Sequence, residues 1–446
     1  MLRVALLDAI ASIWHIGTMK EDNTVRRGLY WFRNDLRLHD NPALLQLAGQ
    51  CSHLLCVYVM DAHWFQWTRY QGKAMGAVRW QFILESLRDL HQQLQQLGHT
   101  LVIRVGRSEE IISELVHEHQ IHIIGVNRLP GTYEARQLAS LQLTLPNRHW
   151  LIEEAFTLFE RSQLPFALQD LPASFTPFRK QVEGLSVLRP VHAPKRLPEA
   201  ISAPSDPVPT RAEPQQSALR LPFRGGETAA LSQLRYYLDS GQVRTYKETR
   251  NQLDGWDFSS KLSPWLAQGC VSPRRVVADL RAHEAAQGAN ESTYWLFFEL
   301  LWREYYQWLH YKVGSHLYHL RGISRRNPLL SFYPEYYMAW REGNTDSAFV
   351  NAFMLQLKQT GWMSNRGRQI VASYFVNELG LDWRYGAAWF EEQLVDYDPA
   401  NNWGNWQYLA GVGTDPRGRR RFDIEKQRLQ YDPDGVFIQR YTEKDS

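Results

Sequence analysis

The stretch from Trp362 to Trp406 contains three segments rich in tryptophan and polar residues: WMSNRGRQ (362–369), LDWRYG (381–386) and VDYDPANNWGNWQY (395–408). Its five tryptophans stand close in sequence to Asp, Asn and Arg residues. A solvated surface needs no tryptophans, and an apolar core excludes unpaired polar side chains. Together the two residue types predict a closed pocket for a large flat ligand, with a few polar groups setting its orientation.

Length and composition indicate a globular protein with more than one domain. The chain has 446 residues, of which 44% are hydrophobic and 22% charged, and a prior of about 150 residues per domain allows two or three domains. The formal net charge is only +3, so nucleic-acid binding would depend on a local basic patch. Cys51, Cys56 and Cys270 form no CxxC motif, which favours a reducing cytosol and a cytoplasmic protein.

Residues 1–27 are predicted to be a dispensable leader. They lack the basic start and the clean apolar run of a signal peptide, and Met19 is an alternative start. No run of 18 apolar residues occurs in the sequence, so we expect no membrane span.

Residues 28–155 alternate between strand-like and helix-like patterns. Buried strands are predicted at 28–33, 52–60, 100–105 and 121–126, and helices at 74–97, after Ser108 and after Gly131. This alternation predicts a doubly wound parallel sheet. The segment has neither GxGxxG nor a P-loop, so a standard nucleotide-binding motif has no support.

The rest of the chain changes character twice. Residues 156–225 are predicted to be an interdomain linker, because eight prolines stand between Pro190 and Pro222 with little periodicity. Residues 226–446 are predicted to be helical, for example where Ser272 caps a helix that has Pro273 at its first position. The predicted fold class is an α/β N-terminal domain joined by a long linker to an all-α domain.

The motifs GWMSNRGRQ, LDWR, NNWGNW and AGVGTDPR, together with WFRNDLRLHDNPAL at 31–44, identify a resemblance to a known family. They are similar in order and spacing to the photolyase/cryptochrome family, and most similar to its DASH branch. The resemblance covers residues 28 to about 435. It implies that the α/β domain binds an antenna chromophore and that the helical domain binds FAD.

The segment SSKLS at 259–263 carries one part of the predicted flavin site. Taken alone, it favours a plain serine-rich helix start over a phosphate site by about two to one, since such caps are common. The family resemblance reverses this preference, because SSKLS matches the flavin phosphate loop. The flavin contacts that the resemblance implies are Tyr246, Ser259, Ser260, Lys261, Leu262, Ser263, Arg303, Arg368, Asp396, Asp398 and Asn402.

A second group of residues is predicted to contact DNA. Glu299 and Trp302 lie on one face of an aromatic helix, and the resemblance places both, with Asn365, at a damaged base pair. A carboxyl in such a pocket could hold its proton and donate it to a pyrimidine carbonyl. A surface salt bridge remains the alternative for Glu299. The further DNA contacts are Arg250, Arg366, Gln369 and Tyr408, of which the last two are DASH-like replacements of a methionine and a tryptophan.

Three tryptophan positions concern electron transfer in the family. Trp406 and Trp383 match the two inner members of its tryptophan chain, while core packing is their alternative role. The outer member has no clear counterpart, because the ungapped position holds Leu330. Tyr333 or Trp340 could replace it, or the chain could be short. Asn402 matches the position opposite flavin N5, where a neutral amide should favour the fully reduced flavin.

The sequence does not favour a metal site, because the histidines at 117–122 and 310–319 have no carboxylate or cysteine at metal-ligand spacing. We therefore predict no metal. The resemblance implies 5,10-methenyltetrahydrofolate as the antenna, with Glu134 as its expected ligand. The basic loop DPRGRRRF at 415–422 is suited to a DNA backbone.

These features predict a blue-light-dependent photolyase, a carbon–carbon lyase of DASH type. It would use excited reduced FAD to split cyclobutane pyrimidine dimers, mainly in single-stranded or looped DNA, and we expect a monomer. A flavin photoreceptor that signals through a partner is the main alternative. A helical nucleic-acid-binding protein without a chromophore is the third possibility.

Overall fold

The first half of the chain contains a parallel β-sheet. The computed structural model describes residues 25–207, 222–415 and 417–443. The strand order is β3-β2-β1-β4-β5, and a short β6 also pairs with β2. All recorded strand pairs are parallel. The strands are β1 (Arg27–Phe32), β2 (His53–Asp61), β3 (Leu101–Gly106), β4 (Ile123–Asn127), β5 (His149–Glu153) and β6 (Glu199–Ala200).

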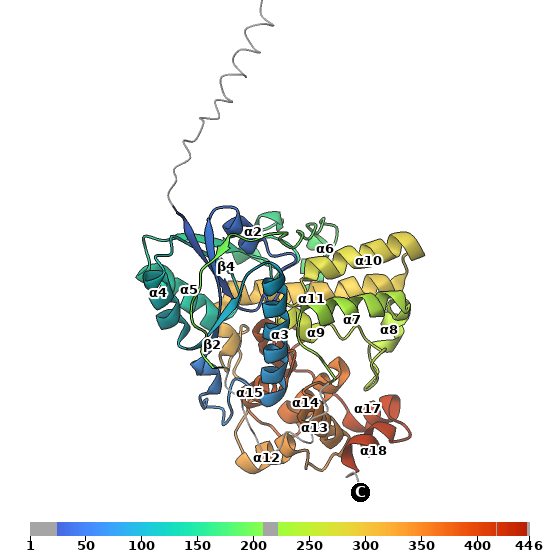
Figure 1. Ribbon diagram of the computed structural model, residues 1–446. Helices are drawn as coiled ribbons and strands as arrows, with labels where there is room; N and C mark the ends of the chain where they lie inside the picture. Colours follow the sequence, from blue (N-terminus) through green and yellow to red (C-terminus); the bar gives the residue numbers. More distant parts are fainter. Residues whose placement is uncertain (1–24, 208–221, 416, 444–446) are drawn as a thin grey trace, which may run out of the picture.

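Helices cover both faces of this sheet (Figure 1). They are α2 (Pro42–Ala48), α3 (Ala77–Gln96), α4 (Ser108–Glu118) and α5 (Thr132–Thr144). Leu29 and Trp31 of β1 pack in one apolar cluster with residues of α4 and α5, while Tyr30 and Phe32 pack in another with α2 and α3. Neighbouring residues of a strand point to opposite faces, so a sheet buried on both faces needs continuous apolar strands. The doubly wound α/β prediction is confirmed.

The region predicted to be a linker contains regular structure. It holds helix α6 (Phe175–Val182) and strand β6, whose residues Glu199 and Ala200 pair with His53 and Leu54 of β2. Sheet pairing therefore fixes part of a segment whose prolines predicted an extended connection. The predicted leader lies almost wholly in residues 1–24, outside the described residues, and Arg27 already belongs to β1.

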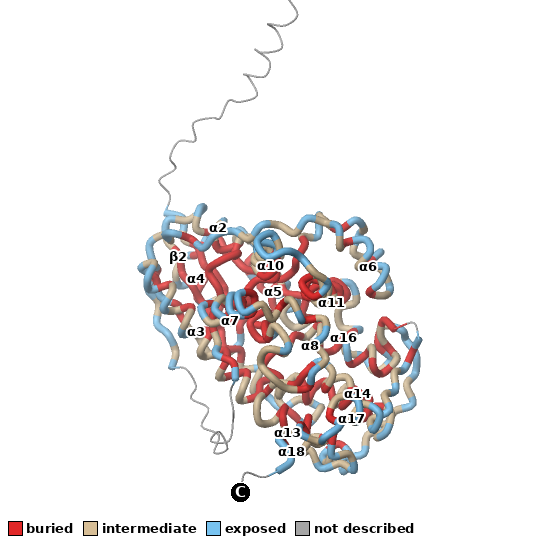
Figure 2. The backbone as a smooth tube through the Cα atoms, turned by 90° about the vertical axis from the view of Figure 1, so that its right-hand side faces the viewer, coloured by how far each residue is buried: buried red, intermediate tan, exposed pale blue. Residues whose placement is uncertain are grey.

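The second half of the chain is helical in every regular element that the structure describes there. Ser272 caps α10 as predicted, since its hydroxyl accepts a hydrogen bond from the Arg275 N–H. In Figure 2 the outer helices α7 and α10 carry many exposed residues, whereas α11 is largely buried. The helices are α7 (Glu227–Asp239), α8 (Tyr246–Thr249), α9 (Ser263–Ala267), α10 (Pro273–Gln287), α11 (Glu291–Val313), α12 (Pro334–Glu342), α13 (Ala348–Thr360), α14 (Asn365–Asn377), α15 (Trp383–Gln393), α16 (Pro399–Ala410), α17 (Ile424–Tyr431) and α18 (Val436–Thr442).

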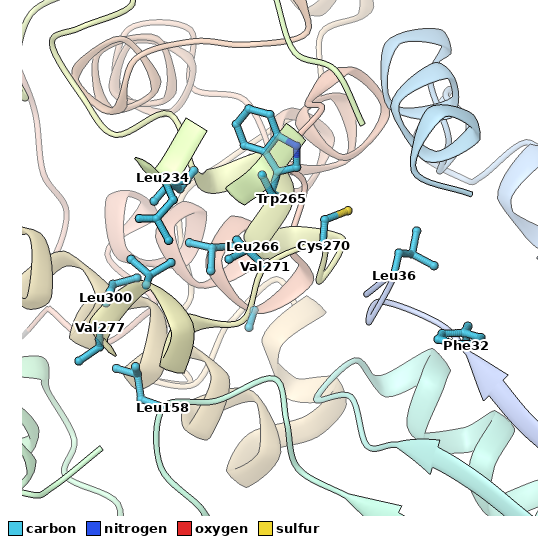
Figure 3. Close-up of a cluster of buried hydrophobic side chains, with 14 of the residues drawn as sticks. Phe32, Leu36, Leu158, Leu234, Trp265, Leu266, Cys270, Val271, Val277 and Leu300 are labelled. Atoms are coloured by element: carbon cyan, nitrogen blue, oxygen red, sulfur yellow. The ribbon is translucent and has the colours of Figure 1, made fainter. Parts of the chain in front are cut away.

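One apolar core continues from the sheet into the helical half (Figure 3). Phe32 and Leu36 belong to the same buried cluster as Leu266 and Cys270. At this junction Gly269 has a φ of +65° and faces the backbone of Asn34 so closely that any side chain would collide with it. The two halves therefore pack as one body around a close backbone contact.

Glu227 at the start of α7 also joins the halves. Its buried carboxylate accepts hydrogen bonds from the Leu38 N–H (2.7 Å), the His39 N–H (3.2 Å) and the His39 ring (2.5 Å). Burial raises the pKa of Glu227, but these hydrogen bonds outweigh it and the pKa is lowered overall.

Replacing Glu227 by alanine should destabilise the protein by about 2–5 kcal/mol, because two backbone N–H groups and a histidine lose their buried acceptor. Glu227→Gln should lose less, since its amide oxygen still accepts one hydrogen bond. Because the folded pKa is lowered, this stabilisation is present above about pH 4.3, the ordinary carboxyl pKa, and is lost as the pH falls through the folded value.

Thermal unfolding followed by circular dichroism measures these differences. The control is Glu291→Ala, which removes an exposed carboxylate paired with Lys247 and should leave the midpoint nearly unchanged. A wild-type midpoint for Glu227→Ala would show that the junction does not depend on this carboxylate.

Candidate functional site

A cavity of about 480 Å³ opens between the segment around α8 and α9 and the helices α11, α14 and α16. Most residues of the predicted site line it, although they come from segments far apart in the sequence. The predicted residues in its wall are Tyr246, Arg250, Ser259, Ser260, Lys261, Leu262, Ser263, Glu299, Trp302, Arg303, Asn365, Arg368, Gln369, Asp396, Asp398 and Tyr408.

Lys261 places a buried cation in the cavity wall. Its side chain lies against Trp362, with the ammonium 3.7 Å from the centre of the indole ring. It forms no close ion pair within the described residues, and burial lowers the pKa of Lys261 to about 7, although the charges of Asp254 and Asp257 oppose this shift. An anionic group beside the three serines of the same loop would favour its charged form. This arrangement fits the diphosphate of a dinucleotide such as FAD.

Asp398 and Gln307 form a polar group at the first turn of α16. Asp398 caps this helix by accepting from the Asn401 N–H, and it also accepts from Gln307 Nε2 at 2.7 Å. Arg303 Nη2 lies 4.0 Å from Asp398 Oδ2, and Arg303 Nη1 donates to the Phe156 carbonyl at 2.7 Å. The buried Oε1 of Gln307 has no partner in the protein, which leaves an acceptor for a donor of the ligand.

Arg368 and Asp396, both predicted flavin contacts, form an ion pair. Arg368 Nη2 lies 3.0 and 2.9 Å from the two carboxylate oxygens, while Arg368 Nε donates to the Met363 carbonyl. The Asp396 side chain is only 3% exposed, so the pair is nearly desolvated on that side. Such a pair presents a fixed dipole to a flat ring beside it.

A smaller cavity of about 110 Å³ continues from this pair towards α15 and α16. Asn402 and Trp406 line it, together with Phe390 and Leu394. Asn402 Nδ2 donates to the Ala387 carbonyl at 2.9 Å, which holds the amide in one orientation. The smaller cavity therefore combines apolar and aromatic walls with polar groups, among them Asp396, Asp398 and the fixed amide of Asn402.

Glu299, Trp302 and Tyr408 also line the large cavity, and Tyr408 lines the smaller one as well. Glu299 forms an ion pair with Arg250. Burial raises the pKa of Glu299, and the nearby Arg250 opposes this rise. Trp302 stacks on Phe175 with ring centres 3.7 Å apart. Its edge also faces Tyr408, whose ring centre lies 6.3 Å away.

Five predicted residues lie outside the large cavity, and one of them, Asn402, lines only the smaller cavity described above. Arg366 donates to Asn251 Oδ1, and Glu134 lies in the first turn of α5, where burial raises its pKa. Trp406 belongs to the smaller cavity, while Trp383 lines none of the cavities described here and is fully buried. The structure does not place Glu134 with the flavin-site residues.

Sequence reasoning missed three groups at this site. Gln307 follows Arg303 by four residues on α11, so helical spacing was the available signal. Arg420 was noticed only as part of a basic loop, but it lines the cavity and lies over the Tyr408 ring at 4.7 Å. Phe156 reaches Arg303 only through the tertiary fold, and no sequence pattern pointed to it.

The described residues contain no group of three or more His, Cys, Asp and Glu side chains arranged to hold a metal ion. Within the same residues, no helix combines the length and apolar character that crossing a bilayer requires.

Comparison with known families covers most of the chain. A family model described as DNA photolyase matches residues 28–199, and one described as the FAD binding domain of DNA photolyase matches residues 295–444. Residues 295–444 include the lining of the smaller cavity, and this agrees with the proposal that the site holds FAD.

Individual relatives extend this match over nearly the full length. A cryptochrome DASH from Idiomarina loihiensis is 48% identical over 420 residues, which cover 94% of this chain and 93% of that protein. One from Vibrio parahaemolyticus is 46% identical and covers 94% of both chains. Among solved structures, a cryptochrome from Synechocystis sp. superposes with a TM-score of 0.88 at 37% identity, covering 94% of this chain and 89% of that one. With this sheet, this helical half and these relatives, the chain belongs to the photolyase/cryptochrome family and, within it, to the DASH cryptochromes.

Proposed function

We propose that this photolyase-like blue-light flavoprotein is a DNA photolyase that repairs cyclobutane pyrimidine dimers, mainly in single-stranded or looped DNA. One observation carries the proposal: the flavin-site residues line the same cavity as Glu299, Trp302 and Tyr408. A dimer taken out of the base stack would enter next to the cofactor. When bound, reduced FAD supplies the electron that opens the dimer under blue light.

The residues of the chain bind and orient the two ligands. Lys261 and the serines of its loop hold the diphosphate, and Arg368 with Asp396 fixes the ring system. Asn402 would lie opposite flavin N5, and its neutral amide cannot supply a proton there. The absence of a proton donor favours the fully reduced cofactor. Glu299 in its protonated form donates a hydrogen bond to a pyrimidine carbonyl, which its raised pKa supports.

Three arginines at or beside the cavity are suited to binding a DNA backbone. Arg250 and Arg420 line the cavity and Arg366 precedes Arg368 of its wall by two residues, and all three would contact phosphates around the extruded dimer. As further parts of the same proposal, the protein acts as a monomer in the cytoplasm. It also carries a methenyltetrahydrofolate antenna near Glu134. A flavin photoreceptor without repair remains the alternative that the experiments below separate from this proposal.

Removing the ion pair of the deep site should abolish flavin binding. Arg368→Ala with Asp396→Ala removes both partners at once, so no unpaired buried charge is left to unfold the protein. The double variant should be folded but largely colourless, whereas the wild type should purify with FAD bound without a covalent link. Flavin absorbance per mole of protein measures this, with circular dichroism as the test of folding.

A matched control removes the ion pair of Glu425 and the partly exposed Arg428, which lies outside the cavity, by the same double substitution and should leave the flavin content unchanged. Stoichiometric flavin in the Arg368→Ala/Asp396→Ala protein would place the cofactor elsewhere.

Repair should depend on the state of the DNA strand. Each base–aromatic stack contributes about 1–3 kcal/mol, and taking a dimer out of a duplex costs a few kcal/mol. Tyr408 and Gln369 offer less stacking surface than a tryptophan and a methionine. Dimers in single-stranded DNA and in bubbles should therefore be repaired, while those in intact duplex should be repaired weakly or not at all.

Chromatographic counting of dimers in the three substrates measures this preference. Tyr408→Trp should raise duplex repair, whereas the control Tyr336→Trp at an exposed site on α12 should not. Equal repair of duplex and single strand would contradict the stacking argument. Absence of repair in all three would favour the photoreceptor.

Photoreduction of the bound flavin should begin at Trp406. Trp406→Phe should slow it strongly under blue light with a thiol reductant, and Trp383→Phe should remove most of the rate. The control is Trp389→Phe, because Trp389 is also buried on α15 but matches no member of the tryptophan chain that the resemblance implies. Trp340 lies 6.2 Å from Trp406, so a loss in Trp340→Phe as large as in Trp383→Phe would assign the second step to Trp340 instead.

A further inference from the structure

The predicted electron path has no evident route from Trp383 to the solvent. Trp383 is fully buried, and its indole N–H donates to the Leu320 carbonyl at 3.1 Å. Leu330, at the position expected for an outer tryptophan, has an aliphatic side chain that cannot be oxidised at a comparable potential. A path through Trp383 therefore needs a different aromatic neighbour.

Trp403 is this neighbour. Its ring centre lies 5.8 Å from that of Trp383, and its indole N–H donates to the Tyr397 hydroxyl. Only 3% of Trp403 is exposed, so Trp403 also needs a partner nearer the solvent. Two tyrosines contact its ring: Tyr318 at 4.9 Å and Tyr70 at 6.1 Å.

The two tyrosines differ in where their hydroxyl groups lie. The Tyr318 hydroxyl faces Nε2 of His310, a fully buried histidine, at 3.2 Å, and burial raises the pKa of Tyr318. Tyr70 is partly exposed and lines an open cavity of about 310 Å³. Leu330 and Tyr385 line the same cavity, so Tyr70 reaches the surface where an outer tryptophan is missing.

The surroundings of Tyr70 favour loss of its proton when it is oxidised. Arg69 Nη2 donates to the Tyr70 hydroxyl at 2.7 Å, and the Arg69 guanidinium lies 4.9 Å from the ring centre. Positive charge beside a phenol disfavours a radical cation and favours a neutral radical. Because the cavity is open to solvent, water can take the released proton.

The position of Tyr70 is fixed although it belongs to a loop of the α/β half. Trp67 and Lys73 form a β-bridge across this loop, and Lys73 N–H donates to the Glu392 carboxylate of α15 at 3.1 Å. Gly72 faces the same carboxylate so closely that a side chain there would collide with it. The loop is therefore attached to the helix that carries Trp383.

We propose that Tyr70 is the electron donor at the solvent end of this path, in the order Tyr70, Trp403 and Trp383. The step from Trp383 to Trp406 is the one that the family resemblance implies. The proposal rests on the proposed function, since it concerns how the flavin is reduced. Oxidised Trp403 takes one electron from Tyr70, and the phenolic proton passes to water in the cavity. The resulting neutral tyrosyl radical takes an electron from a small thiol in solution and a proton from water.

Electron paramagnetic resonance of illuminated, rapidly frozen holoprotein tests this assignment. The wild type without added thiol should show a neutral tyrosyl signal that narrows when ring-deuterated tyrosine is incorporated. Tyr70→Phe should lose this signal and slow thiol-dependent photoreduction severalfold. Tyr385→Phe is the matched control, because Tyr385 lines the same cavity but has no recorded ring contact with Trp403. It should keep both the signal and the rate.

Trp403→Phe should also lose the tyrosyl signal, which tests the step before Tyr70. A signal that persists in Tyr70→Phe and disappears in Tyr318→Phe would overturn the proposal in favour of the buried tyrosine. Wild type that photoreduces without any tyrosyl signal would overturn it as well. Repair by chemically reduced wild type, which needs no photoreduction, tests the proposed function separately.

Discussion

The arrangement of the cavity depends on the hydrogen bonds that the buried carboxylate of Glu304 accepts. It accepts hydrogen bonds from the N–H groups of Leu158 (2.8 Å) and Phe159 (3.2 Å) and from the Trp308 indole (2.7 Å). A fully buried carboxylate is tolerated only while such donors are in place, so the chain leaving the sheet can attach to α11 in one register. Arg303 precedes Glu304 directly, and the same attachment therefore sets its position in the cavity wall.

The cavity combines groups that an apolar core would exclude. Lys261 is buried without a close ion pair within the described residues, and Gln307 Oε1 has no hydrogen-bond donor. Unsatisfied polar groups reduce stability, and a ligand that satisfies them binds the folded state alone. The protein is thus expected to gain stability from its cofactor at the same groups that recognise it, as is common where a fold is organised around a bound molecule.

The α/β half contributes to the helical half through backbone and side-chain contacts at several places. Asn34 lies against Gly269, Glu227 accepts from the segment 38–39, and the loop before α3 reaches Glu392 on α15. These contacts are short and buried or partly buried, so the halves cannot shift independently without breaking them. The first half therefore does more than hold an antenna, because it shapes the surroundings of the aromatic residues in the second.

The sequence by itself determined the alternation of strands and helices, because periodicity and helix caps depend on neighbouring residues. It also identified most of the cavity lining, since SSKLS, the aromatic helix and the 362–408 segments carry recognisable local patterns. Only the tertiary structure decided that Arg250 pairs with Glu299, that Arg420 covers Tyr408, and that β6 joins the sheet. It also decided that Tyr70 meets Trp403, more than 300 residues away in the chain. Such contacts follow from how distant segments pack, and local sequence patterns hold no information about that distance.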